Sequence, residues 1–210
     1  MATPRIALCD VGLGNLRSVE KALARVGAAV VRTADPEAVR RADKIVVPGQ
    51  GAFRDCMAAL GGPLGDAVRE AVGAGKPYLG ICLGLQVLFD ESDEQGPCAG
   101  LGLLRGRVRR FPPDLRDADG RRLKVPHMGW NQVEVVRSVP LLAALPPRPY
   151  FYFVHSYFPE PADPAVVVGE GVYGRRFTVA VQRDNVFACQ FHPEKSQAAG
   201  LALLRAFVTG

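Results

Sequence analysis

One cysteine stands in a setting that would make its sulfur a nucleophile. Cys82 follows the short apolar run Tyr78 to Ile81, precedes the helix-forming stretch Leu83 to Phe89, and is framed by Gly80 and Gly84. Glycines around a strand-to-helix turn let the backbone approach itself closely and expose the central side chain above the sheet. A helix that begins at the sulfur favours the reactive thiolate. A cysteine taken alone is more often a buried structural residue, but this frame predicts a nucleophile elbow.

A thiol nucleophile also needs a base that a third group orients. Asn185 to Glu194 reads as a strand that ends in His192 and Glu194. Residues two apart in an extended chain point to the same side, so Glu194 could hold the His192 imidazole while His192 takes the thiol proton. Taken alone, His-Pro-Glu is typical of a solvated strand end. Together with the elbow, it predicts a catalytic triad of Cys82, His192 and Glu194.

These motifs resemble the class I, or triad, glutamine amidotransferases. Pro48 to Phe53, Gly80 to Gln86 and His192 to Glu194 stand in that family's order and approximate spacing, and the resemblance covers nearly the whole chain. It implies hydrolysis of glutamine to glutamate and ammonia through a glutamyl thioester on Cys82, with no cofactor. A non-catalytic binding or regulatory module of the same fold is the alternative from another class, and the intact triad argues against it.

The resemblance also implies which residues meet the substrate. The peptides of Gln50 or Gly51, together with the Leu83 amide, would stabilise the tetrahedral oxyanion. Gln86 would contact glutamine, and the backbone of the segment after the aromatic strand would hold its amino-acid end. The implied substrate and oxyanion residues are Gln50, Gly51, Leu83, Gln86, His155, Ser156 and Tyr157.

Four further segments are similar to the glutaminase subunits that serve histidine biosynthesis: Gly12 to Ser18, Pro126 to Asn131, His155 to Tyr157, and Lys195-Ser196. This similarity implies a heterodimer with a (β/α)8-barrel cyclase subunit, which uses the ammonia to make imidazole glycerol phosphate and an aminoimidazole carboxamide ribotide. The implied interface residues are Asn15, Trp130, Asn131 and Lys195. A glutaminase subunit of another pathway, such as pyridoxal phosphate synthesis, stays open.

The elements that would position these residues alternate between strands and helices in the first half of the chain. Ile6 to Cys9 reads as a buried parallel strand, and Ala29 to Val31 and Ile45 to Val47 read as two more short strands of a parallel sheet. The helix from about Leu16 to Val26 has Asn15 as its N-cap. Beyond Gly102, short strands take over. They are expected at Leu104 to Phe111, Arg121 to Val125, Val133 to Val136, Tyr150 to His155, Val166 to Tyr173 and Thr178 to Arg183.

The expected fold is therefore α/β, with three layers: a mostly parallel central sheet flanked by helices, and antiparallel strand additions in the C-terminal half. Pro126 to Asn131 reads as a loop and Ser196 to Phe207 as an amphipathic helix with Ala199, Leu203 and Ala206 on its apolar face. No polar linker divides the chain, so residues 1–210 are expected to form a single domain.

Composition and charge narrow the function classes. No apolar run is long enough to cross a bilayer, and Met1 to Arg5 leads straight into a strand without a signal peptide, which predicts a cytoplasmic protein without a membrane partner. The five scattered cysteines should be reduced, and the spacing of the three histidines predicts no metal site. In a chain with a net charge of +5, the densest basic patch is Arg105 to Arg110 with Arg121-Arg122. No stacking aromatics interleave with these arginines, so the patch reads as a solvated strand-loop region and not as a nucleic-acid site. A surface for an acidic partner is the alternative.

Overall fold

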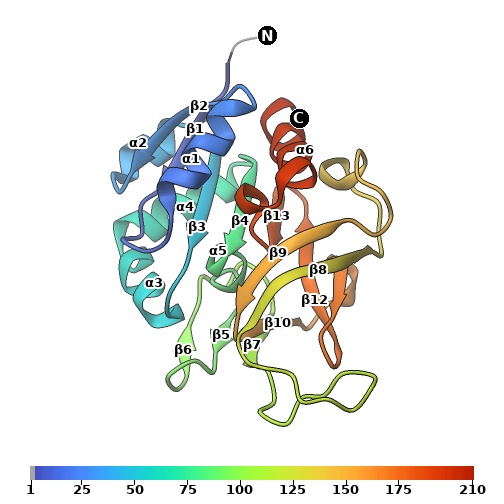
Figure 1. The fold of residues 1–210 in the computed structure, drawn as a ribbon. Helices are drawn as coiled ribbons and strands as arrows, with labels where there is room; N and C mark the ends of the chain where they lie inside the picture. Colours follow the sequence, from blue (N-terminus) through green and yellow to red (C-terminus); the bar gives the residue numbers. More distant parts are fainter. Residues whose placement is uncertain (1–2) are drawn as a thin grey trace.

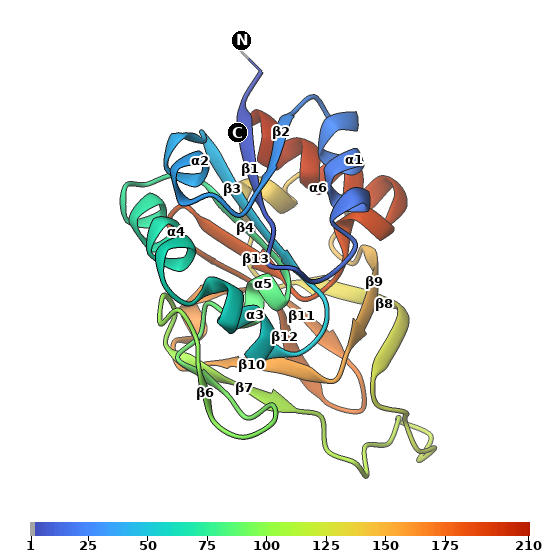
Figure 2. The same ribbon diagram turned by 90° about the vertical axis from the view of Figure 1, so that its left-hand side faces the viewer.

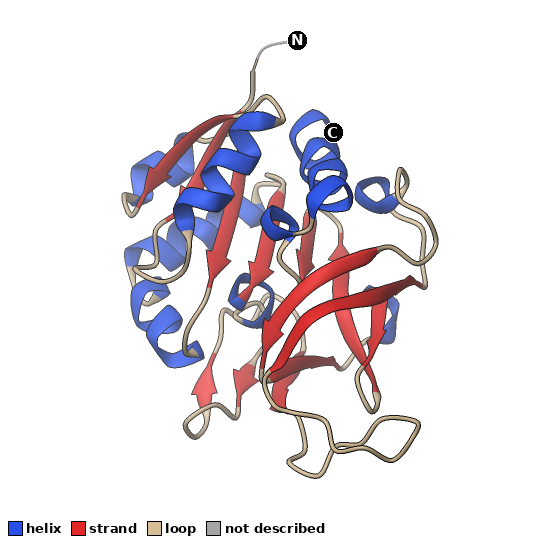
Figure 3. Ribbon diagram, viewed as in Figure 1, coloured by secondary structure: helices blue, strands red, loops and turns tan. Residues whose placement is uncertain are grey.

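The computed structural model describes residues 3–210, which form a nine-stranded sheet between helices (Figures 1 and 3). Five parallel neighbours come first in the sheet order: β2 (Ala29–Thr33), β1 (Arg5–Cys9), β3 (Lys44–Gly49), β4 (Tyr78–Cys82) and β13 (Val186–Cys189). Four antiparallel strands extend the sheet: β12 (Arg176–Arg183), β11 (Val167–Val172), β8 (His127–Val135) and β9 (Tyr150–His155). Of the segment Met1 to Arg5, which was expected to lead straight into a strand, Met1 and Ala2 lie outside the described residues, and β1 begins at Arg5.

Helices cover the parallel part of the sheet on both faces, as Figures 1 and 2 show. α1 (Leu16–Arg25) and α6 (Gln197–Thr209) pack on one face, while α2 (Pro36–Arg41), α3 (Phe53–Leu60) and α4 (Pro63–Gly73) cover the other. β1 is buried on both sides, because Ile6 and Leu8 face one apolar core and Ala7 and Cys9 face the other. These three layers confirm the fold class expected from the sequence.

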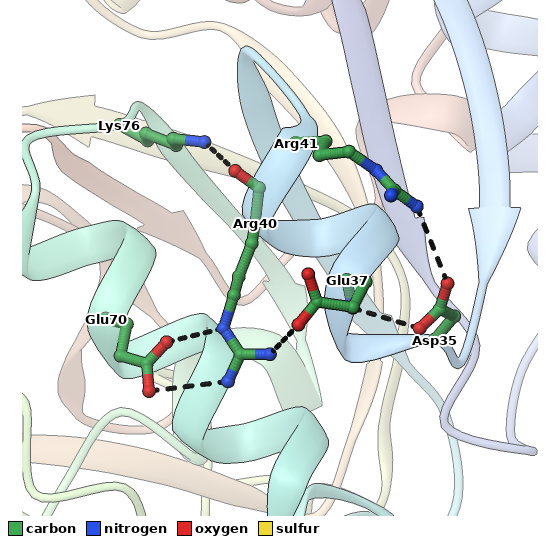
Figure 4. A network of polar contacts seen from close by, with 6 residues as sticks. All are labelled: Asp35, Glu37, Arg40, Arg41, Glu70 and Lys76. Atoms are coloured by element: carbon green, nitrogen blue, oxygen red, sulfur yellow. Dashed lines mark hydrogen bonds and ion pairs between the residues drawn. The ribbon is translucent and has the colours of Figure 1, made fainter.

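The Asn15 cap at the start of α1 is also confirmed, since its side chain accepts a hydrogen bond from the Ser18 amide at 3.2 Å. On the opposite face, Arg40 ties α2 to α4 (Figure 4). Its guanidinium pairs with Glu70 of α4 at 2.6 Å and with Glu37 of its own helix, while Lys76 Nζ donates to the Arg40 carbonyl oxygen. The Arg40 ion pairs are solvent-exposed, so each contributes little to the stability of the fold.

A second, four-stranded sheet lies beside the end of β4 and was not predicted. Its order is β10 (Tyr157–Pro161), β7 (Gly106–Arg110), β5 (Glu91–Ser92) and β6 (Cys98–Ala99). Three short 3-10 helices complete the fold: η1 (Pro140–Leu142), η2 (Pro164–Val166) and η3 (Pro193–Lys195). None of the helices within residues 3–210 is long and apolar enough to cross a membrane.

Several predicted boundaries were wrong. Residues 121–125 are a loop with one isolated bridge, Arg116 to Arg122, and the strand begins instead at His127, inside the segment expected to be a loop. The helix after Cys82, α5 (Leu83–Gln86), has only four residues. In α6, Leu203 is buried as expected, together with Gly200, Leu204, Phe207 and Val208, whereas Ala199 and Ala206 are only half-buried. The strand that begins at His127 depends on its pairing with β9 and β11, which local composition does not encode.

Candidate active site

Cys82 is held in a strained backbone conformation at the carboxyl end of β4. Its φ of 55° and ψ of −103° are unusual for a residue with a side chain, and they turn the chain from strand into α5. The turn is possible because its flanking residues are glycines. A Cβ at Gly80 would lie 2.3 Å from the Gly84 carbonyl oxygen, and one at Gly84 would lie 1.8 Å from the Val47 carbonyl oxygen. The predicted elbow is therefore the observed one.

His192 and Glu194 meet beside the elbow, although not in the way the sequence suggested. β13 ends at Cys189, and Glu194 lies in the short 3-10 helix η3 rather than in extended chain. The contact is nevertheless made, with His192 Nδ1 2.8 Å from Glu194 Oε1 and both side chains almost fully buried. Ser196 braces the turn, because its hydroxyl donates to the His192 carbonyl oxygen at 2.6 Å and accepts from the Tyr152 amide at 3.0 Å.

The charges around His192 favour an imidazolium. Burial by itself lowers the pKa of His192, but the Cys82 sulfur and the Glu194 carboxylate raise it, and the net pKa is about 10. Within the described residues, Nε2 of the ring has no hydrogen-bond partner, so it is the atom left to exchange a proton at the reacting centre. Glu194 thus holds Nδ1 of the ring and leaves Nε2 for proton exchange.

A pocket of about 430 Å³ opens over the elbow. Its wall contains Cys82 and brings together residues that are far apart in sequence, including every one expected to meet substrate or oxyanion: Gln50, Gly51, Leu83, Gln86, His155, Ser156 and Tyr157. Gln50 and Gly51 follow β3, whose last residue Gly49 pairs with Cys82 across the sheet. This is the carboxyl end of the parallel strands, where open α/β sheets bind their ligands.

Two polar residues of the site were missed in the sequence. Glu94 lines the pocket, and its Oε2 accepts the Phe53 amide at 2.7 Å. Gln190 is fully buried, and its Nε2 approaches Cys82 Sγ at 3.5 Å while its Oε1 accepts from Gln86 Nε2 at 3.0 Å. A lone glutamine in the apolar run before His192 was the signal that could have identified Gln190, because a buried amide must have partners.

The four residues expected at a partner interface lie in different settings. Trp130 is 47% exposed, and Lys195 lines the pocket with its ammonium over the Tyr152 ring. Asn15 caps α1 near the His192–Glu194 pair. The Asn131 side chain turns inward and donates to the Val172 carbonyl oxygen at 2.9 Å. The role of all four residues as partner contacts stays a prediction.

Three of the other cysteines, Cys9, Cys56 and Cys189, are fully buried. All five are free thiols, but burial raises the pKa of Cys9 and of Cys56 to about 12, and that of Cys189 well above its ordinary value. Such thiols are inert at neutral pH. No cluster of three or more histidine, cysteine or acidic residues that could hold a metal occurs in residues 3–210.

Two arginines of the basic patch are paired with neighbouring carboxylates. Arg107 pairs with Glu91 at 3.2 Å, and Arg109 pairs with Asp93 at 2.8 Å and lies 3.7 Å from Glu160. These contacts join strands of the smaller sheet, as expected for a solvated strand region.

Comparisons with known proteins identify the family of the chain. The family model "Glutamine amidotransferase class-I" matches residues 7–209. The fold is shared with PurLQS from Thermotoga maritima (TM-score 0.72, 19% identity, 98% of both chains) and with the glutaminase domain of Trypanosoma brucei CTPS (TM-score 0.65, 19% identity, 98% of this chain and 94% of that one). The chain belongs to the class I glutamine amidotransferase family.

Within that family, the chain is similar along nearly its whole length to proteins named "Imidazole glycerol phosphate synthase subunit HisH". The protein from Nitrosospira multiformis is 54% identical over 207 residues, which cover 97% of this chain and 96% of that protein. The one from Syntrophotalea carbinolica is 51% identical over 203 residues, covering 96% and 98%. Their name describes a subunit, so this kinship implies a partner subunit.

Proposed function

We propose that this chain is the glutaminase subunit of imidazole glycerol phosphate synthase and that it hydrolyses glutamine to glutamate and ammonia. The observation that carries the proposal is a strained, pocket-lining Cys82 beside the buried His192–Glu194 pair. The proposal is also supported by sequence identities of 51% and 54% with proteins of that name over nearly the full length of the chain.

In the first half of the reaction, the Cys82 thiolate attacks the carbon of the glutamine carboxamide. The carbonyl electrons move to oxygen, and the resulting oxyanion accepts hydrogen bonds from the Leu83 amide and from a peptide of the Gln50–Gly51 loop. Collapse of this intermediate breaks the C–N bond while His192 Nε2 gives its proton to the leaving nitrogen. Ammonia departs, and a glutamyl thioester remains on Cys82.

In the second half, water adds to the thioester carbonyl and gives a proton to His192, which acts as base. Collapse of the second tetrahedral intermediate breaks the C–S bond, releases glutamate and regenerates the thiolate. Glu194 holds the imidazole orientation through both halves. Glu94 offers the pocket a carboxylate for the substrate's α-ammonium group, and the 155–157 segment receives its carboxylate end.

The ammonia is passed to a (β/α)8-barrel cyclase subunit, which makes imidazole glycerol phosphate and an aminoimidazole carboxamide ribotide. The outer face of the β8–β9 ribbon suits this docking, because Met128, Trp130 and Tyr150 are 62%, 47% and 57% exposed. Tyr152 and Val154 of the same ribbon line the pocket, as does Lys195. An apolar patch of this kind beside an active site is typical of a protein interface.

The test uses the chain assembled with the cyclase. The wild-type complex should form imidazole glycerol phosphate from glutamine, and the Cys82→Ala complex should form it only from added ammonium salt. Cys98→Ala, which alters a half-buried cysteine outside the pocket, is the matched control and should retain glutamine use. Glutamine use by the Cys82→Ala complex, or failure of the wild-type complex to use glutamine while it uses ammonium, would reject the proposal.

A further inference from the structure

Two buried histidines lie next to the pocket and take no part in the triad. His127 of β8 and His155 of β9 are cross-strand partners, and His127 Nδ1 is 3.0 Å from His155 Nε2. β8 and β9 run side by side along the edge of the sheet in Figures 1 and 3. His127 stacks on Phe153 and lies against Tyr173, with ring centroids 4.8 and 4.2 Å apart.

The partners of this pair fix where each proton lies. His155 Nδ1 is 2.8 Å from the Tyr157 carbonyl oxygen, which can only accept, so His155 carries its proton on Nδ1. His155 Nε2 is then an acceptor, and His127 must donate to it from Nδ1. His127 Nε2 is left as an acceptor, and Asn131 Nδ2 donates to it at 3.2 Å.

The orientation of the Asn131 amide is fixed independently. Its Nδ2 donates to the Val172 carbonyl oxygen at 2.9 Å, and its Oδ1 accepts the Gln132 amide at 2.8 Å. A flipped amide would lose both bonds. The hydrogen bonds therefore run in one direction, from Asn131 through the two imidazoles to the Tyr157 carbonyl.

Both imidazoles must be neutral for this arrangement to exist, because a second proton on either ring would point one N–H group directly at another. Burial lowers the pKa of His127 to about 4 and that of His155 to about 3. The other titratable groups facing the pair are Tyr173, whose hydroxyl donates to the Lys124 carbonyl oxygen, and His192, whose charge acts on His155. The remaining rings around the pair are phenylalanines, among them Phe111 and Phe177.

This series of hydrogen bonds ends at the Tyr157 carbonyl oxygen, and a second series of hydrogen bonds connects the same oxygen to Cys82. The Tyr157 carbonyl oxygen also accepts from Gln86 Nε2 at 3.0 Å. Gln86 bonds Gln190, and Gln190 Nε2 donates to Cys82 Sγ. The wall of the pocket at 155–157 is thus held from the ribbon side by His155 and from the elbow side by Gln86.

We propose that His127 and Asn131 are positioning residues, which keep His155 in its Nδ1–H form and thereby fix the 155–157 wall of the glutamine pocket. The inference rests on the proposed function for the identity of the substrate. Neither residue touches the reacting atoms. Their effect is expected on substrate binding, because the wall receives the amino-acid end of glutamine, away from the bond that breaks.

The experiment compares His127→Asn with His127→Leu in the complex with the cyclase. An asparagine amide can place an N–H donor where Nδ1 stands, whereas leucine cannot. His127→Leu should raise KM for glutamine by about tenfold or more, as expected when a buried acceptor loses its partner, with a much smaller change in kcat. His127→Asn should recover most of the wild-type KM. The ammonium-dependent reaction should be unchanged in both.

Nitrogen-15 NMR of the imidazoles reports the tautomers directly, and a purely structural role for His127 would not change the His155 spectrum. His155 should carry its proton on Nδ1 in wild type and His127→Asn, and should lose this preference in His127→Leu. Asn131→Asp, which replaces the donor to His127 Nε2 by an acceptor, is the second route if His127→Leu does not fold, and should also raise KM.

An Nε2–H form of His155 in the wild type, or a wild-type KM in the variants that lose the donor, would overturn the inference. The proposed function fails separately, when the wild-type complex does not use glutamine. In that case the tautomer measurement still decides whether the pair is ordered as described.

Discussion

The buried histidine pair makes a quantitative prediction for stability against pH. The folded-state pKa of His127, about 4, lies below its ordinary value of 6.5. Between these two values the unfolded chain binds a proton that the folded chain does not, so stability is lost as pH falls through that window. From pH 7 to pH 5 this linkage costs about 2 kcal/mol for His127, and His155, with a pKa of about 3, adds a similar amount.

The share of His127 is isolated by comparing wild type with His127→Asn, because asparagine does not titrate. Urea unfolding followed by far-ultraviolet circular dichroism at pH 7 and pH 5 gives the free energy of unfolding of each protein. Wild type should lose about 2 kcal/mol more than His127→Asn over this range. Any cavity left by the smaller side chain lowers stability equally at both pH values. Equal losses in the two proteins would refute the assignment of a neutral, buried His127.

The remaining predictions concern the triad, the elbow and the docking surface. His192→Ala should lower glutaminase kcat by at least about 10⁴-fold, and the loss in Glu194→Ala should be smaller than this by a factor of roughly ten to a hundred. The double variant should be no worse than His192→Ala. Additive losses in steady-state assays would mean that Glu194 has a separate task. Gly84→Ala, whose Cβ would lie 1.8 Å from a carbonyl oxygen, should abolish activity or yield an unfolded chain by circular dichroism, and an active, folded variant would contradict the tight elbow. Glutamate release should be slow for the chain alone and fast with the ligand-bound cyclase, and equal turnover in both states would argue against docking-dependent activity. Trp130→Ala and Lys195→Ala should weaken cyclase binding in calorimetry, and unchanged affinity would argue against docking at this surface.

The elbow could be predicted from sequence because its determinants are local. Gly80 and Gly84 are required by close backbone contacts around Cys82, and the apolar runs before them are typical of buried parallel strands. The α/β class could be predicted from the alternation of strands and helices in the first half of the chain. These features depend on neighbours within a few residues, which a linear pattern records.

The antiparallel half was harder to predict because its strands depend on distant partners. Pro126, Gly129 and the polar residues around Trp130 suggest a loop, yet residues 127–131 pair with β9 from His127↔His155 to Asn131↔Phe151. The inward turn of Asn131 follows from that pairing, as does the meeting of the two histidines. Register across a sheet cannot be read from either strand alone.

The His192–Glu194 contact was predicted for the wrong reason. Extended geometry was expected to bring the two side chains together, whereas the 3-10 helix η3 does so, with Ser196 bracing the turn. Pro193 at the start of η3 favours such a turn, since its fixed φ suits the first helical position.

The central claim, that glutamine is cleaved through a thioester on Cys82, can be tested by trapping the intermediate. The complex with the cyclase is mixed with glutamine labelled in its carbon skeleton, quenched in acid during turnover, digested and analysed by mass spectrometry. We expect the glutamyl group on the peptide that contains Cys82, bound through an acid-stable and hydroxylamine-labile linkage. Turnover without labelled protein, or label on another cysteine such as Cys56, would contradict the account.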